Sequence, residues 1–299
     1  MDQFRLMKIY VAVADEHGFA AAARRLSMSP PAVTRAIAQL EDHLGIQLLQ
    51  RSTRYVRATE AGLVYLENSR RILEDLEAAN AEATGLRVRP TGLLSITAPV
   101  LFGQMFVMPT IIKYLREHPD ITVNAVFLDR VVNILEEGLD VAVRIGHLSD
   151  SAAMARKVGS VRIILCASPG YLAEHGIPKS PEDLKQHRLI SSRSLNPVPE
   201  WRFQKNGKSK TFKIEPRLTV TSNGGAIEAA LANFGIVRLI SYQAAPYLQN
   251  GSLKTVLSEL EPPAMPVHLL HREGRLPSAR VRGFIDILSS DLRSDKHLN

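Results

Sequence analysis

The chain has 299 residues, of which 45% are hydrophobic and 22% are charged, the composition of an average globular protein with about two domains. No apolar run approaches the ~20 residues of a membrane-spanning helix, and the N-terminal segment MDQFRLMKIY lacks a signal-peptide pattern. The single cysteine, Cys166, excludes a disulfide framework and any zinc site made of several cysteines. We therefore expect a cytoplasmic protein without a membrane partner, in which Cys166 is a small buried side chain of the apolar run VRIILCAS.

The net charge of +7 does not by itself indicate a nucleic-acid partner, because most of it lies far from the N-terminus. Residues 1–89 contain 12 Lys and Arg against 11 Asp and Glu, a net charge of +1. Residues 90–299 contain the other 25 basic and 19 acidic side chains, a net charge of +6. Evidence for DNA binding must therefore come from local clusters and motifs rather than from overall basicity.

Three helices are predicted near the N-terminus. The first two, at 2–16 and 19–26, each have an apolar face at helical spacing, formed by Leu6, Ile9, Tyr10 and Val13 and by Phe19, Ala22, Ala23 and Leu26. A short turn at 27–29 separates them from the third, whose apolar residues are Val33, Ile37, Leu40 and Leu44. Ser29 is a favourable N-cap, Pro30 suits the first helical position, and Gly45 favours the helix end.

Helix, short turn and helix is the arrangement that places a second helix in the major groove of DNA. It also occurs as a plain helical hairpin in many small bundles, so this geometry leaves both interpretations open. The opposite face of the third helix carries Thr34, Arg35, Ala38 and Glu41. If the helix enters a groove, Thr34 and Arg35 in its first turns would meet the base edges.

An arginine-rich segment follows the third helix. Residues 46–49 alternate as a short strand does, and the next residues, RSTRYVR at 51–57, contain three arginines and no acid. This pattern predicts a hairpin, a wing whose Arg51 and Arg54 reach phosphates or a narrow minor groove. A solvated arginine-rich loop is the alternative.

A long helix is predicted from Glu60 to about Leu86, with Thr59 as its cap. Its residues at heptad spacing, widened by Leu66 and Leu73, predict pairing with another helix and thus a homodimer or homotetramer. The alternative is a long helix that packs on its own domain. The heptad residues are Tyr65, Ser69, Ile72, Leu76, Ala79, Ala83 and Leu86. A linker with Pro90 and Gly92 then follows.

From Leu93 onward, strands alternate with helices, which predicts an α/β domain with parallel strand pairs. Strands are predicted at 94–97, 121–128, 140–145, 161–167, 201–203, 218–221, 235–239 and 267–270. Helices are predicted around 107–115 and at 131–137, 171–175, 226–234, 241–248 and 279–292.

The sequence contains no G-x-S-x-G, H-E-x-x-H, P-loop or G-x-G-x-x-G motif, so we expect no enzyme activity, no cofactor and no metal. His268 and His271 lie close together but have no acidic or cysteine neighbour in the sequence, which favours surface or packing roles over metal binding.

Small ligands bind open α/β sheets beyond the carboxyl ends of the strands, near helix N-termini. Three predicted strand ends carry suitable groups, although each of these residues could simply be a cap or a turn. The candidate ligand-binding residues are Thr97, Pro99, Val100, Arg144, Gly146, His147, Ser222 and Asn223.

The order of these parts resembles the LysR-type transcriptional regulators over nearly the whole chain. The most specific match is GFAAAARRLSMSPPAVTRAIAQLEDHLGIQLLQRSTRYVRATEAG, which is similar to the family's winged helix-turn-helix and the start of its linker helix. The blocks DVAVRIGHL, SNGGAIEAALANFGI and RLPSARVRGFIDIL resemble its effector-binding domain. The resemblance implies two α/β subdomains of the periplasmic-binding-protein type, with chain crossings near residues 165 and 267.

The resemblance therefore implies a winged helix-turn-helix at 1–59, a linker helix and hinge at 60–91, and an effector domain at 92–299. Subdomain one would comprise 92–165 and 268–299, and subdomain two 166–267. Family members are usually dimers or tetramers on DNA, and many respond to a small, often anionic molecule.

One departure from the family concerns base reading. The family commonly has Gln where this chain has Pro30, and a Gln can pair with adenine through two hydrogen bonds, whereas Pro has no side-chain donor. Base reading should therefore depend on Thr34 and Arg35, with Pro30 and Pro31 limited to apolar contact with a thymine methyl group. The family's wing arginine corresponds to Arg54, which Arg51 precedes.

Together these features predict a sequence-specific DNA-binding transcriptional regulator that responds to a small-molecule effector. The excess positive charge after residue 90, with Arg144 near a strand end, favours an anionic effector. The alternative from another class is a cytoplasmic small-molecule-binding or enzymatic α/β protein with an unrelated helical N-terminus.

Overall fold

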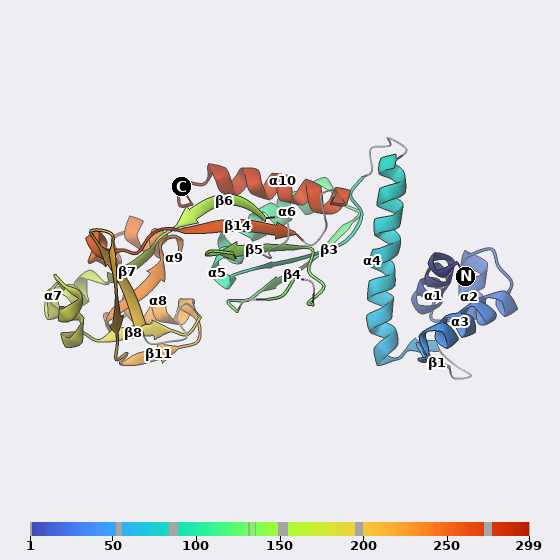
Figure 1. Ribbon diagram of the computed structural model, residues 1–299, viewed down its shortest axis with the longest axis horizontal. Coiled ribbons are helices and arrows are strands. Elements are labelled where there is room, and N and C mark those ends of the chain that lie inside the picture. The colour runs from blue at the N-terminus through green and yellow to red at the C-terminus, as the bar shows by residue number, and fades with distance from the viewer. Residues whose placement is uncertain are drawn as a thin grey trace. The chain divides into compact units, whose positions relative to one another are not determined.

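The computed structural model describes residues 2–51, 56–83, 89–130, 132–134, 136–148, 155–194, 200–271 and 277–298. The chain divides into two compact units, Met1–Arg89 and Pro90–Asn299. The first unit is mainly helical, and the second is built on two β-sheets (Figure 1).

The first unit begins with α1 (Gln3–Asp15), α2 (Phe19–Arg25) and α3 (Pro30–Leu44), as the apolar spacing predicted. A turn joins α2 to α3, and α3 ends at Gly45, whose φ of 69° is a left-handed conformation that glycine adopts without steric cost. The three inner faces form one apolar core, which includes Leu6, Ile9, Tyr10, Val13, Ala22, Ala23, Val33, Ile37 and Leu40. The predicted helix-turn-helix is therefore confirmed.

A two-stranded antiparallel ribbon follows α3. It consists of β1 (Leu49–Arg51) and β2 (Val56–Ala58), with Leu49 opposite Ala58. The predicted hairpin is thus present in its two strands, while the connection at 52–55 lies outside the described residues.

Helix α4 (Glu60–Ala83) begins after Thr59, whose Oγ1 accepts a hydrogen bond of 2.9 Å from the Gly62 amide. The beginning of α4 packs on its own unit: Ser69 is fully buried, and the ring of Tyr65 lies 5.6 Å from that of Tyr10. The prediction that Tyr65 and Ser69 face a second helix of a partner is therefore wrong, because both face the unit's own helices. The predicted end near Leu86 falls outside the described residues.

The second unit contains two five-stranded sheets (Figure 1). The order of the first is β4-β3-β5-β14-β6, and its strands are β3 (Gly92–Ala98), β4 (Ile121–Phe127), β5 (Val141–Ile145), β6 (Ala155–Val161) and β14 (Met265–His271). The order of the second is β11-β8-β12-β7-β13, and its strands are β7 (Ile163–Ala167), β8 (Leu189–Ser192), β11 (Leu218–Val220), β12 (Ile236–Ile240) and β13 (Lys254–Val256). A separate antiparallel pair is formed by β9 (Glu200–Lys205) and β10 (Lys208–Lys213).

The sheets are mixed rather than purely parallel. Strand β3 runs parallel to β4 and β5, but β14, which enters from the distant C-terminal part, is antiparallel to β5 and β6. Likewise β12 is parallel to β8 and antiparallel to β7. Local alternation of strands and helices predicted only the parallel pairs, because the antiparallel partners are distant in sequence or follow directly on another strand.

Helices of both subdomains cover the sheets. The first sheet carries α5 (Val100–Phe102), the π-helical turn η1 (Gly103–Val107), α6 (Met108–Glu117) and α10 (Ala279–Ser294). The second carries α8 (Asn223–Leu231) and α9 (Ser241–Gln249), with α7 (Pro169–His175) and the 3-10 turns η2 (Pro181–Gln186) and η3 (Ser258–Leu260) in the same subdomain. The predicted helix at 131–137 is absent from the described residues of that segment, which form turns. The guanidinium of Arg130 binds both carboxylate oxygens of Glu137, closing the segment as a loop.

The chain passes between the two sheets twice. The first crossing is at Arg162, between β6 and β7, and the second lies in 257–264, between β13 and β14. The predicted positions near 165 and 267 lie inside β7 and β14, slightly after each crossing. The sequence shows one continuous apolar run through 161–167, so it did not reveal the break at Arg162.

The core of the first subdomain contains Phe284 and Tyr114, whose rings lie 5.5 Å apart and join α10 to α6. Cys166 is fully buried in β7, and burial raises the pKa of its thiol to about 12, which fits a small packed side chain. No helix within the described ranges is long and apolar enough to cross a membrane.

Candidate DNA-binding surface and ligand cleft

The outer face of α3 carries five of the predicted DNA-binding residues. Ser29, Pro30, Pro31, Thr34 and Arg35 are all exposed at its N-terminal end, opposite the buried face formed by Val33 and Ile37. The structure therefore brings these five together on one surface. Arg35 forms no ion pair or hydrogen bond with any residue in the described part of the chain, so its guanidinium is available to a ligand.

The start of α3 offers unusually few backbone donors. The first two helical residues are prolines without an N–H group, and the Ala32 and Val33 amides donate to the Ser29 carbonyl at 2.9 and 3.2 Å. The Ser29 hydroxyl makes no capping hydrogen bond, since the amides it would otherwise accept from are missing or paired with its carbonyl. Contacts between a phosphate and this helix end must therefore come from side chains rather than from the helix N-terminus.

Two side chains of α3 have roles that the sequence did not reveal. The hydroxyl of Thr34 donates to the carbonyl of Pro30 at 3.0 Å, which orients its methyl group and leaves its oxygen as an acceptor. Glu41 is not part of the exposed reading face: its Oε1 accepts from the amides of Leu48 and Leu49 at 2.9 and 3.0 Å. Glu41 therefore positions the first strand of the ribbon beside α3.

The ribbon carries the predicted wing arginines. Arg51 is the last residue of β1, but its side chain and the whole of Arg54 lie outside the described residues. Arg57 of β2 is exposed and lies opposite Gln50. The described strands thus place the arginine-rich segment directly after the strand that Glu41 positions.

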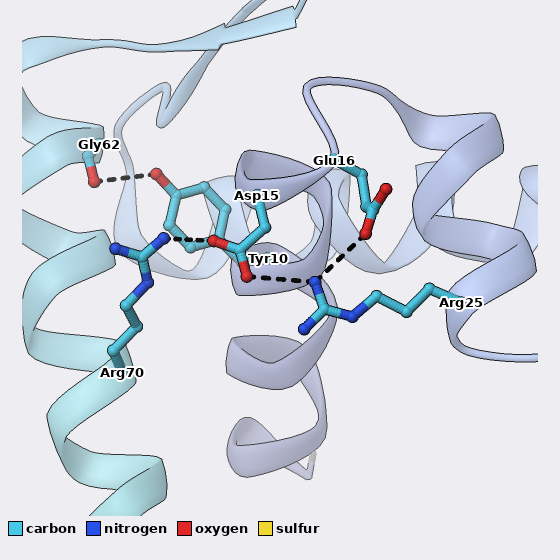
Figure 2. Close-up of polar contacts among 6 residues, drawn as sticks. All are labelled: Tyr10, Asp15, Glu16, Arg25, Gly62 and Arg70. Carbon is cyan, nitrogen blue, oxygen red and sulfur yellow. Dashed lines mark hydrogen bonds and ion pairs between the residues drawn. The ribbon is translucent and has the colours of Figure 1, made fainter. Parts of the chain in front are cut away.

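A polar cluster joins the helix-turn-helix to α4 (Figure 2). Asp15, at the end of α1, binds Arg25 of α2 at 3.2 Å and Arg70 of α4, and Arg25 also reaches Glu16 at 3.4 Å. The Tyr10 hydroxyl donates to the carbonyl of Gly62 at 2.9 Å, and burial raises the pKa of Tyr10 to about 12. Asp15 and Tyr10 therefore tie α4 to the helices that carry α3.

A cavity of about 260 Å³ opens between the two subdomains of the second unit. Four predicted ligand-binding residues line it: Thr97, Pro99, Arg144 and Asn223. The structure adds Leu128, Asp129, Arg130, Ser194, Tyr242, Gln243 and Met265 to its wall. The side chains come from strand ends of the first sheet and from the starts of α8 and α9, as expected of a cleft at the carboxyl ends of strands.

The other four predicted ligand residues do not line this cavity. The Val100 amide is occupied, since it donates to Asp129 Oδ1 at 3.0 Å. Ser222 caps α8 by accepting from the Gly225 amide at 3.2 Å. Gly146, with a φ of 117°, donates from its amide to the Pro266 carbonyl, and His147 is exposed. These four residues therefore act as caps and turns in the structure, which is the alternative that the sequence left open.

No pattern in the sequence indicated that Tyr242, near the start of α9, would be a buried residue of the cleft wall. It is fully buried, and its ring lies 5.3 Å from Phe102 and 5.7 Å from Phe106. Burial raises the pKa of its phenol above the ordinary value, so it is neutral in the cleft. Because Tyr242 belongs to subdomain two and both phenylalanines to subdomain one, these rings join the two walls.

The described wall of the cleft consists of charged, hydroxyl, amide and apolar side chains. Within the described ranges, no three His, Cys, Asp or Glu side chains are grouped so that they could hold a metal ion. His268 and His271 lie in β14, and burial lowers the pKa of His268.

Comparison with known proteins identifies both units of the chain. The model "Bacterial regulatory helix-turn-helix protein, lysR family" matches residues 4–63, and the model "LysR substrate binding domain" matches residues 87–293. An uncharacterized HTH-type transcriptional regulator of Haemophilus influenzae is 31% identical over 284 residues, which are 95% of this chain and 98% of that protein.

Solved structures share the fold. CrgA, a LysR-type transcriptional regulator from Neisseria meningitidis, is 29% identical with a TM-score of 0.62, over 96% of this chain and 98% of its own. The Vibrio cholerae virulence activator AphB is 26% identical with a TM-score of 0.61, over 97% of this chain and 99% of its own.

Proposed function

Because this chain belongs to the LysR family of DNA-binding transcriptional regulators that respond to effectors, we propose that the exposed face of α3 reads its target sequence. The observation that carries this proposal is the position of Arg35. Its guanidinium is exposed in the first turns of α3 and has no protein partner among the described residues. An arginine so placed can donate two hydrogen bonds to a guanine in the major groove.

The other predicted DNA-binding residues of α3 and the wing divide into those that contact bases and those that contact phosphates. Thr34, with its hydroxyl hydrogen directed to Pro30, offers a methyl group and an acceptor to the bases. Pro30 and Pro31 contribute apolar contact, and the free hydroxyl of Ser29 serves a phosphate. Arg51 and Arg54 of the wing add phosphate or minor-groove contacts, which position the domain without reading the sequence.

We propose that residues 1–59 bind DNA, 60–91 link and pair the protomers, and 92–299 bind the effector. Pairing would use the surface of α4 that the unit's own helices leave open. Val64 and Ile72 are large apolar residues of α4 that are 60% and 36% exposed and lie on adjoining sides of the helix, and such side chains mark a contact surface when they cluster. A homodimer or homotetramer would set two α3 helices against half-sites on one face of DNA.

The cleft between the subdomains is the proposed effector site, where Thr97, Pro99, Arg144 and Asn223 meet. Arg144, at the end of β5, supports the sequence-based expectation that the effector carries a negative group. Effector binding can change DNA binding only if the cleft binds it more tightly in one arrangement of the oligomer than in another. In this proposal the protein acts in the cytoplasm, where its DNA is, and carries out no catalysis.

A gel-shift titration tests whether the exposed face of α3 reads the DNA sequence. It compares binding to DNA that flanks the protein's own gene with binding to random DNA of equal length. Arg35→Ala should weaken binding to the specific site by about 1–3 kcal/mol, roughly five- to 150-fold, and should affect random DNA much less. Lys8→Ala is the matched control, because Lys8 is an exposed cation of α1 that pairs with Glu77 of α4 at 3.3 Å. An equal loss on both DNAs would make Arg35 a phosphate contact, and no selective shift with wild-type protein would contradict the proposal.

A further inference from the structure

The cleft contains two charged side chains that lack an ionic partner within the described part of the chain. Asp129 follows β4, and Arg144 lies in β5; these strands flank β3 on either side. Among the residues that the structure describes, Arg144 makes one polar contact, a hydrogen bond of 2.6 Å to the Val132 carbonyl. The third charged residue of the wall, Arg130, is neutralised by Glu137 at 2.7 Å. The cleft therefore presents one negative and one positive group that a ligand could pair with.

Asp129 occupies a place that an anionic ligand would otherwise take. Its Oδ1 accepts from the Val100 amide at 3.0 Å, which is the first backbone N–H after β3 because residue 99 is a proline. A helix start at the carboxyl end of a strand is where open α/β sheets ordinarily bind a ligand anion. A ligand carboxylate at this point would lie beside the carboxylate of Asp129 and be repelled by it. The negative group of the effector is thus directed away from Val100 and toward Arg144.

The wall from subdomain two contributes a second acceptor. Asn223 is 5% exposed and lines the cavity, and its Oδ1 is buried without a hydrogen-bond partner among the described residues. A buried amide oxygen without a donor is costly, and such groups in native structures are normally paired. The carboxylate of Asp129 and Oδ1 of Asn223, from the two subdomains, are therefore acceptors that a hydrogen-bond donor in the cavity would satisfy.

We propose that the effector is a small zwitterion, whose ammonium group pairs with Asp129 and Asn223 and whose acidic group pairs with Arg144. This inference rests on the proposed function, since it takes the cleft as the effector site. A cavity of about 260 Å³ suits a molecule of amino-acid size. Because its ammonium group would contact Asp129 of subdomain one and Asn223 of subdomain two, such a ligand would bridge the subdomains.

The test uses the full chain and three matched series of probes. The twenty standard L-amino acids are compared with their N-acetyl derivatives, which keep only the carboxylate, and with their primary amides, which keep only the ammonium group. Thermal shift identifies binding, and calorimetry measures Kd. We expect at least one amino acid to raise the melting temperature and to bind at least tenfold more tightly than either of its derivatives.

Variants of the two charged residues show which residue binds the ammonium group of the ligand and which binds its carboxylate. Asp129→Asn keeps an acceptor for the Val100 amide, and should weaken binding of the amino acid at least tenfold without weakening its N-acetyl derivative. Arg144→Gln should weaken the amino acid and the N-acetyl derivative, but not the amide. Asp120→Asn is the matched control, because Asp120 is an exposed carboxylate of the same subdomain outside the cavity, and should leave all three affinities unchanged.

Equal binding of N-acetyl derivatives to the wild-type protein, unchanged selectivity in Asp129→Asn, or no binding by any amino acid would each overturn the proposal. These results would not affect the proposed regulator function. A gel shift of the wild-type protein without added amino acid tests that function independently.

Discussion

The close approach of α4 to the wing gives a stability prediction that can be worked from one glycine. A Cβ at Gly62 would lie 2.0 Å from the carbonyl oxygen of Leu48 and 2.9 Å from the hydroxyl oxygen of Tyr10. Real Cβ atoms essentially never approach within 3.0 Å, and the Leu48 oxygen belongs to the backbone, so it cannot rotate away. Gly62→Ala must therefore push α4 away from the ribbon by about 1 Å.

The free-energy cost has three parts. Forcing a side chain into a packed site costs about 1–3 kcal/mol. Weakening the Tyr10–Gly62 hydrogen bond of 2.9 Å adds about 0.5–1.5 kcal/mol. The lower entropy of the unfolded alanine chain opposes these by about 0.4–1 kcal/mol. A net loss of about 2 kcal/mol should lower the melting temperature of a unit this small by roughly 8–16 °C.

Two spectroscopic signals can separate the units. Trp201, the single tryptophan, is buried in the second unit, so its fluorescence reports unfolding of that unit alone. Far-UV circular dichroism also reports the helices of the first unit. In Gly62→Ala, the urea transition seen by circular dichroism should gain an earlier phase, while the Trp201 transition should stay in place.

The matched control is Gly224→Ala in α8, where an added Cβ meets no atom within 4 Å. It should be neutral or stabilise by up to about 1 kcal/mol. If the Gly62→Ala transition coincided with that of the wild type, the argument from close approach would be refuted. An equal shift of the Trp201 transition would refute the assignment of the effect to the first unit.

Two further predictions concern the same unit. Burial raises the pKa of Tyr10 from 10.0 to about 12, so the stability contributed by its neutral phenol is present below pH 10 and is lost as the pH rises through about 12. In urea titrations between these pH values, the free energy of unfolding of Tyr10→Phe should therefore fall less than that of the wild type. If both fell equally with pH, the loss would not come from ionisation of Tyr10. Val64→Glu combined with Ile72→Glu should separate the protomers in sedimentation velocity, because both side chains are exposed apolar groups on adjoining sides of α4. Glu67→Gln is the control on the same helix, and an unchanged assembly in the double variant would show that this surface is not the main interface.

The contacts of the first unit also suggest how a signal reaches the DNA. Asp15 joins α1, α2 and α4 through Arg25 and Arg70, and Tyr10 adds a buried bond to Gly62 (Figure 2). Helix α4 and the helix-turn-helix should therefore move as one body. A change in how two protomers pair would then alter the separation of their α3 helices rather than the position of α3 on its own unit.

Local sequence patterns were sufficient for the elements of the N-terminal unit. Apolar residues at helical spacing predicted α1, α2 and α3, and Ser29, Pro30 and Gly45 marked the boundaries of α3. These features depend on backbone preferences and on side chains within a few turns, so they can be recognised without knowing any distant contact. The same holds for the exposed position of Thr34 and Arg35.

The heptad pattern of α4 shows where such reasoning stops. Tyr65 and Ser69 have the spacing of a helix-pairing seam, but they face α1 and its core, because an apolar stripe does not specify which surface will cover it. The sequence likewise gave no sign that Glu41 would hold the amides of Leu48 and Leu49, since that contact depends on how the chain turns back after Gly45.

The cleft was the least predictable part. Strand ends and caps predicted Thr97, Pro99, Arg144 and Asn223, because carboxyl ends of parallel strands meet at one sheet edge. Its full wall needs two sheets, joined where the chain crosses at Arg162 and again before β14.

The sequence by itself thus determined the helix-turn-helix, the order of the domains and the presence of a ligand site in the α/β part. Only the tertiary structure decided which carboxylate accepts from the amide at the start of the helix after β3, which cleft charges have no ionic partner among the described residues, and which face of α4 stays open. The physical reason is that a hydrogen bond or an ion pair between distant segments is set by the distance between them. Residues such as Asp129 and Val100, which are 29 positions apart, meet only when the sheet brings them together.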